Sequence, residues 1–273
     1  MRGEGRAHPA EPGASRSGML TQVGHLALRS VVRTLRQPAM VIPSIAFPMI
    51  LLAVNSAGLK SATRLPGFPT NSYLTFALAI TFVQGALFAA MSSGTNVAND
   101  IETGFLNRLA LTPLRRSALI LGQLAGIIVL GLIQATTFIV VGAIAGAGFH
   151  TGVPGALVIV DIAVLIALGF GTLGAFIALR TGSGEAVQGL FPLLFAALFL
   201  SSMAMPRDLI SADWFRTIAT YNPVSYILEA IRSLMITGWD GHALALGFAC
   251  AGGITVIALV AASSALRTAM VRT

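Results

Sequence analysis

The chain has 273 residues, of which 55% are hydrophobic and only 10% are charged, and its formal net charge is +7 at pH 7. Because a soluble domain has about 25% charged residues, this composition excludes an ordinary water-soluble protein. The positive charge does not indicate nucleic-acid binding, since no basic cluster is interleaved with aromatic residues on a folded domain.

Six long apolar runs follow one another along the chain. A transmembrane helix needs about 20 apolar residues to cross a hydrocarbon layer about 30 Å thick. The runs are continuous rather than alternating, which favours helices over strands. We therefore predict an all-α integral membrane protein whose six transmembrane helices lie near residues 39–59, 72–98, 117–149, 155–179, 186–206 and 243–266.

The basic residues predict the orientation of these helices. If both termini and the loops 99–116 and 180–185 lie in the cytoplasm, that side holds 12 of the 17 basic residues. Cytoplasmic loops carry an excess of arginine and lysine, so we expect both termini in the cytoplasm. The basic residues include one lysine, Lys60, and the dominance of arginine indicates a GC-rich bacterial genome. We therefore expect a multi-pass protein of a bacterial cell membrane.

The segment before the first apolar run has apolar residues at helical spacing on one side and Arg29, Arg33 and Arg36 on another. This pattern predicts an amphipathic helix in the cytoplasmic headgroup layer, with the arginines facing anionic lipid. Pro38 ends it. The expected parts are a disordered cytoplasmic leader at 1–19, this helix at 20–38, a six-span domain at 39–266 and a cytoplasmic tail at 267–273.

The loop after the second run predicts a short cytoplasmic helix. Asn99 or Asp100 can cap its start, and Asp100 and Glu102 would then lie near the positive end of the helix dipole. The loop continues with an apolar ridge and a proline stop, at Phe105, Leu106, Leu109 and Pro113. An apolar ridge at the membrane surface needs lipid or protein to cover it.

Residues 207–242 predict two helices too short to cross a membrane, separated by Asn222 and Pro223. We expect a broken helical hairpin in the outer leaflet between the fifth and sixth spans, covered by protein because irregular backbone is not stable against lipid. In the second helix, Glu229 and Arg232 are expected on the side away from its apolar residues.

Two motifs resemble those of the type-2 ABC export permeases, and within them the daunorubicin-resistance-type drug-efflux permeases. The second motif joins Phe199-Leu200-Ser201-Ser202 to Met205-Pro206, Trp214, Asn222-Pro223-Val224 and Arg232. The first is similar to the family's acidic-Thr-Gly-Phe-Leu…Arg-Leu…Pro pattern, and by resemblance its residues form the helix that couples to an ATPase: Asp100, Glu102, Gly104, Phe105, Arg108, Leu109 and Pro113.

The resemblance implies a dimer of permeases above two ATP-binding subunits, with the helix at 20–37 as a connecting helix. A chain that hydrolysed ATP would need a G-x-x-x-x-G-K-[ST] loop. The single lysine lies in Gly58-Leu59-Lys60-Ser61, which does not match. We therefore expect a transport subunit that is not an enzyme and holds no cofactor or metal, with ATP and Mg²⁺ bound by the partner.

Polar residues inside a span mark a transport path or a helix interface. In the second run they recur every three or four residues with one aromatic, at Thr81, Gln84, Phe88, Ser92, Thr95 and Asn96. The family's cavity lies between the second and fifth spans, and the fifth run has Phe191, Phe195 and Phe199 at four-residue spacing. These residues are the candidate substrate path, although both stripes are also typical of helix packing.

Three alternatives remain for the function. The expected cargo is a hydrophobic or amphipathic compound, such as a drug, an antibiotic or a lipid. A permease for lipid or polysaccharide precursors fits the same sequence. A proton-coupled carrier is favoured only by Asp161, the single acid inside the fourth run, whereas such carriers use several intramembrane charges.

Overall fold

The computed structural model describes residues 19–105, 108 and 116–269, and every regular element in that part of the chain is helical. This confirms the all-α prediction. The long helices are α1 (Met19–Leu35), α2 (Pro38–Gly58), α3 (Tyr73–Glu102), α5 (Arg116–Ile144), α6 (Gly152–Thr181), α7 (Gly184–Phe199) and α10 (Gly241–Ala269). The short elements are η1 (Lys60–Arg64), η2 (Arg207–Leu209), α8 (Asp213–Tyr221), α9 (Pro223–Arg232) and η3 (Ser233–Thr237).

Five described helices, α2, α3, α5, α6 and α10, are long and apolar enough to cross a membrane. They match five of the six predicted runs. The remaining run, at 186–206, forms α7, whose 16 residues rise about 24 Å, followed by a non-helical stretch at 200–206. The predicted fifth span is therefore shorter than its apolar sequence.

The non-helical stretch after α7 is stabilised by a buried arginine. Arg232 is 6% exposed, and its guanidinium lies 3.5 Å from the centre of the Phe76 ring. Without water, freed carbonyl groups need protein donors, and Arg232 donates to three of them, at 3.1, 2.6 and 2.6 Å: those of Phe76, Ser202 and Met203. The prediction that Arg232 points away from the apolar side of its helix is therefore wrong.

Asn222 joins the end of α7 to the start of α9. Its side-chain amide donates to the carbonyl groups of Ala197 and Leu200, at 2.7 and 3.1 Å. Its Oδ1 accepts the N–H of Val224 at 2.9 Å, which caps α9 as the following proline begins that helix. The predicted helical break at Asn222 is confirmed, and one side chain satisfies groups at two helix ends.

The centre of the bundle is α3, which packs closely on α6 through small residues. A Cβ atom on Gly174 of α6 would overlap the carbonyl oxygen of Ala90, and one on Gly94 of α3 would overlap Val187. Small residues let backbones approach closely in membrane helices. Thus α3 lies inside the subunit, whereas α2 and α10 present much of their surface outward.

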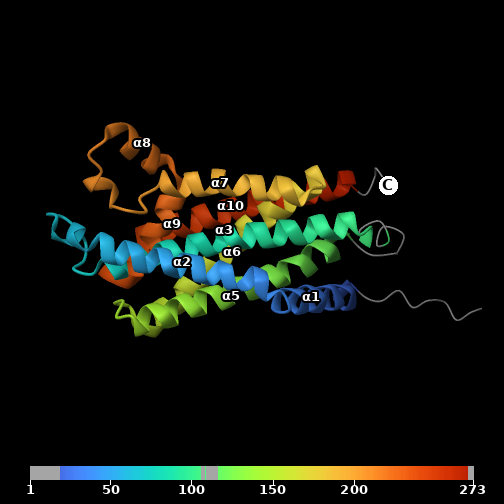
Figure 1. Ribbon diagram of the computed structural model, residues 1–273, viewed down its shortest axis with the longest axis horizontal. Coiled ribbons are helices and arrows are strands. Elements are labelled where there is room, and N and C mark those ends of the chain that lie inside the picture. Colours follow the sequence, from blue (N-terminus) through green and yellow to red (C-terminus); the bar gives the residue numbers. More distant parts are fainter. Residues whose placement is uncertain (1–18, 106–107, 109–115, 270–273) are drawn as a thin grey trace, which may run out of the picture.

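Figure 1 shows the long helices running along one axis, with α1, the end of α3, the start of α7 and the end of α10 at one end of the molecule. We call this the arginine-rich end, because the chain positions there include Arg29, Arg33, Arg36, Arg108, Arg180 and Arg267. The short helix α8 lies at the opposite end (Figure 1). The helices therefore alternate in direction as the span prediction requires.

Candidate functional site

At the arginine-rich end, α1 packs along α5 rather than lying apart from the bundle. Two glycines of α5 allow this approach, since a Cβ atom on Gly122 would overlap Leu26 and one on Gly126 would overlap the Ser30 hydroxyl. The Ser30 hydroxyl also lies 3.5 Å from the carbonyl oxygen of Gln123. The amphipathic helix predicted at 20–38 thus forms, and its small polar residues face α5.

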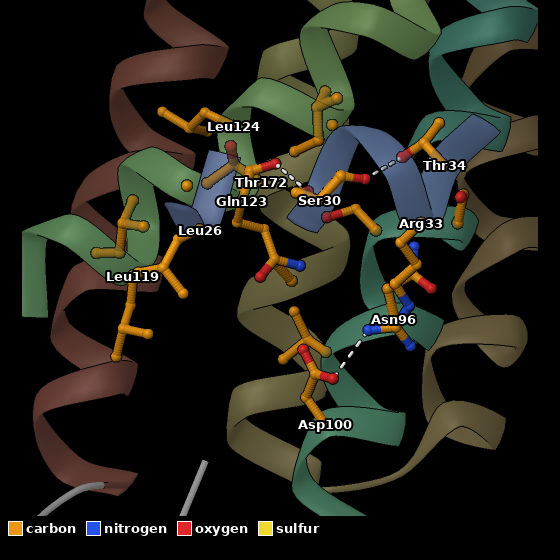
Figure 2. A pocket seen from close by; sticks show the side chains of 18 of the residues that line it. Leu26, Ser30, Arg33, Thr34, Asn96, Asp100, Leu119, Gln123, Leu124 and Thr172 are labelled. Carbon is orange, nitrogen blue, oxygen red and sulfur yellow. Dashed lines mark hydrogen bonds and ion pairs between the residues drawn. The ribbon is translucent and has the colours of Figure 1, made fainter. Parts of the chain in front are cut away.

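The last turn of α3 is connected to α1 by a three-residue ion cluster. The Asp100 carboxylate lies 2.9 Å from Nη2 of Arg29 and 2.8 Å from Nη1 of Arg33, and Figure 2 shows Arg33 directed toward it. Asp100 is only 8% exposed. The expectation that Asp100 caps a new helix is therefore wrong, because Asp100 lies in the last turn of α3. Arg29 and Arg33 also have a protein partner that the amphipathic pattern did not predict.

The position of Asp100 explains why it needs these partners. It lies near the C-terminus of α3, which ends at Glu102, and a carboxylate is unfavourable at the negative end of a helix dipole. Two guanidinium groups compensate for that cost. The sequence did contain a signal that α3 extends to this point, since Asp100 continues the series Ser92 and Asn96 at four-residue spacing. We overlooked it because we expected a new helix to begin at 99–100.

The segment after α3 turns sharply at Gly104, whose φ of 65° is the left-handed conformation that glycine favours at a helix end. Phe105 follows, and the guanidinium of Arg29 lies 3.8 Å from the centre of its ring. Arg108 donates a hydrogen bond of 3.2 Å to the carbonyl of Thr103. Glu102 is exposed, while the other coupling candidates lie outside the described residues: Leu106, Leu109 and Pro113.

The polar stripe of α3 divides into two parts. Thr81 and Gln84 are 1% and 2% exposed, so they lie in the interior of the subunit. Ser92 lies nearer the arginine-rich end and lines a cavity between α1, α3, α5, α6 and α10. The structure therefore brings Ser92, but not Thr81 and Gln84, to an open space.

The aromatic candidates come together as one group, which we call the phenylalanine ladder. Its ring centres are separated by 5.3–6.0 Å, a spacing typical of interacting aromatic pairs. Phe199 is 52% exposed at its end. The ladder joins three helices through Phe47 of α2, Phe88 of α3 and Phe191, Phe195 and Phe199 of α7.

Sequence reasoning missed Phe47, because α2 has no stripe of aromatic residues to single it out. Asp161 is exposed on α6, and it has no ion pair among the residues that the structure describes. Asp161 therefore lies on the outer surface of the bundle, away from the described ion pairs, which are all near the two ends of the molecule. This arrangement does not favour a proton-coupled carrier, which uses several intramembrane charges.

Known proteins resemble this chain over most of its length. The ABC-2 type transporter family matches residues 21–236. A putative transport permease, ycf38, of Porphyra purpurea is 26% identical over 225 residues, which cover 81% of this chain and 77% of the relative. A probable doxorubicin resistance ABC transporter permease protein, DrrC, of Mycobacterium tuberculosis is 23% identical over 214 residues, which cover 77% and 75%.

Proposed function

The chain belongs to the ABC-2 type transporter family, so it is a multi-pass membrane subunit that works with a separate ABC ATPase, and on that premise we propose that it exports hydrophobic or amphipathic compounds from a bacterial cell. Both termini then lie in the cytoplasm, and ATP and Mg²⁺ bind to the partner. The observation that carries the proposal is the phenylalanine ladder, an apolar aromatic surface on α2, α3 and α7 that leaves Phe199 half exposed.

The ladder suits flat aromatic cargo because aromatic rings contribute large apolar area and stack on other rings. The doxorubicin in the name of one relative is an aromatic compound with an amine, and this supports a drug-like substrate. The other relative's name states only transport. We therefore favour drug efflux over export of lipid or polysaccharide precursors, which lack an aromatic ring system for these phenylalanines to stack against.

A second permease copy would complete the path. The outward surfaces of α2 and α7 next to the ladder are apolar, with Ile42 64% and Leu193 68% exposed. A second copy facing them would enclose the exposed end of the ladder and form a cavity between two subunits. In this arrangement the cargo passes between the copies rather than through the closed interior of one.

Coupling to the ATPase is proposed at the arginine-rich end. Phe105 follows directly on the last turn of α3, and Arg29 holds its ring against α1. A movement that the ATPase imposes on this segment would reach α3 through the peptide chain and α1 through Asp100. The predicted coupling residues Glu102, Arg108 and Leu109 would complete the contact.

The test is doxorubicin export by the chain co-expressed with its ATPase in everted vesicles. Phe191→Ala with Phe195→Ala is expected to lower uptake at least ten-fold at unchanged protein level. Phe248→Ala removes an exposed phenylalanine of α10, which is 36% exposed and outside the ladder, and serves as the matched control. Uptake unchanged by the double variant, or equally lowered by the control, would remove the ladder from the path.

A further inference from the structure

The cavity at the arginine-rich end lies within one subunit and is separate from the phenylalanine ladder. It has a volume of about 90 Å³ and is open to the surface on one side. A drug-sized ligand occupies a pocket of about 300–1,000 Å³, so the cavity is too small for whole cargo. It is larger than the about 10–15 Å³ that one water needs. The space thus suits part of a larger molecule that remains mostly outside.

Three polar side chains on its wall each have one atom without a hydrogen-bond partner among the described residues. The Ser93 hydroxyl, the Asn96 Oδ1 and the Thr172 hydroxyl are buried and make no hydrogen bond within the part of the chain that the structure describes. Ser93 is 5% and Thr172 2% exposed, and all three residues line the cavity. Since buried polar groups are nearly always hydrogen-bonded, these atoms indicate a bound molecule with donors and acceptors.

The charge at the cavity mouth favours an anion. The charged residues that line the cavity are Arg29, Arg33 and Asp100, so one positive charge is left after pairing. The Arg29 side chain is 43% exposed, and its guanidinium has five N–H donors, more than its two contacts with Asp100 use. Basic sites between helices at the cytoplasmic surface bind anionic lipid headgroups.

The polar and apolar groups are arranged in layers. Asn96 and Ser93 precede Asp100 by four and seven residues on α3, so they lie about 6 and 10 Å deeper along the helix. Apolar side chains make most of the deeper wall, where Ile127 and Leu130 pack with Ala89. The sequence of layers, first guanidinium, then hydroxyl and amide, then hydrocarbon, is that of a phospholipid read from its phosphate to its acyl chain.

We propose that this cavity binds one anionic phospholipid of the cytoplasmic leaflet, with its phosphate on Arg29 and a headgroup hydroxyl donating to the Asn96 Oδ1. Its ester oxygens accept hydrogen bonds from the hydroxyls of Ser93 and Thr172, and one acyl chain enters beside Ile127. The lipid bridges α1 to α3 and α6. It is a fixed component of the subunit and not its cargo, and its place in the cytoplasmic leaflet rests on the proposed orientation.

The experiment is native mass spectrometry of the full chain, purified with its ATPase, delipidated and titrated with phosphatidylglycerol, phosphatidylcholine or inorganic phosphate. We expect one phosphatidylglycerol per permease chain, bound at least ten-fold more tightly than phosphatidylcholine, and no competition by inorganic phosphate. Thr172→Val keeps the side-chain size and should weaken binding about three- to ten-fold through one lost hydrogen bond. Ala175→Leu fills the cavity wall and should abolish it.

The control is Arg36→Gln, because Arg36 directly follows α1, is exposed and does not line the cavity. If Arg36→Gln weakens binding as much as Thr172→Val, the lipid is held by the basic surface and the proposal fails. Equal retention of phosphatidylcholine contradicts the anionic headgroup. Displacement by inorganic phosphate contradicts the lipid assignment, and wild-type binding in both cavity variants means that the buried polar atoms hold only water.

Discussion

Replacing Asp100 by asparagine removes the carboxylate that two arginines of α1 share, while it keeps the shape of the side chain. The Arg33–Asp100 pair is largely shielded, with side-chain exposures of 22% and 12%, and a hydrogen bond to a charged group contributes about 1.5–3 kcal/mol. Arg29 is 43% exposed, so solvent screening limits its pair to about 0–1 kcal/mol. Together these contributions amount to about 1.5–4 kcal/mol, so we expect Asp100→Asn to weaken the docking of α1 by a factor of about 10–1,000.

The assay is amide hydrogen exchange on the purified full chain with its ATPase. Exchange across α1 should accelerate by that factor, because local opening sets the rate, whereas amides in the middle of α6 should be unchanged. Glu102→Gln is the matched control, since Glu102 is exposed on the same helix end and has no ion pair among the described residues. Unchanged exchange in Asp100→Asn, or equal acceleration in Glu102→Gln, would refute the view that this cluster holds α1.

Four further outcomes are expected. Phe105→Ala should lower co-purification of the ATPase at least ten-fold while membrane insertion stays normal, because burying such a side chain contributes about 1.5–3 kcal/mol; normal pull-down would exclude it from the contact. Arg232→Lys should lower the melting temperature of the chain, since one ammonium group cannot replace a fork that reaches three carbonyl groups, and an unchanged melting curve would contradict this. Gly174→Ala should cost about 1–3 kcal/mol of stability by overpacking, whereas Gly252→Ala, with nothing near its Cβ position, should not; equal effects would argue against the close α3–α6 contact. A reporter fused after Thr273 should be found in the cytoplasm, and a periplasmic signal would reverse the orientation.

The membrane helices were predictable because their length and apolar composition are local properties of the sequence. The same holds for the break at Asn222, where an amide cap and a proline adjoin. The shortened α7 was not predictable in this way. Its apolar sequence continues to residue 206, and the non-helical end is stabilised by residues from later in the chain, Asn222 and Arg232. Arg232 also binds the carbonyl group of Phe76, 156 positions away.

The candidate site was predicted in its parts and missed in its connections. Asp100 and Phe105 were identified from the motif after the second run, and the ladder residues of α7 from their spacing. The pairing of Asp100 with Arg29 spans 71 positions and depends on how α1 packs against Gly122 and Gly126 of α5. Such ion pairs depend on how helices pack in three dimensions, and the local pattern of charges in the sequence does not predict that packing.

The side-chain amide of Asn222 binds the last carbonyl groups of α7 and the first N–H group of α9. These hydrogen bonds connect the two helices mechanically. A rotation of α7 about its axis would act on α9 through these bonds, and through α9 on Arg232 and the carbonyl groups of Ser202 and Met203 that Arg232 binds. If α7 moves during transport, the end of the molecule opposite the arginine-rich end would therefore change shape together with it.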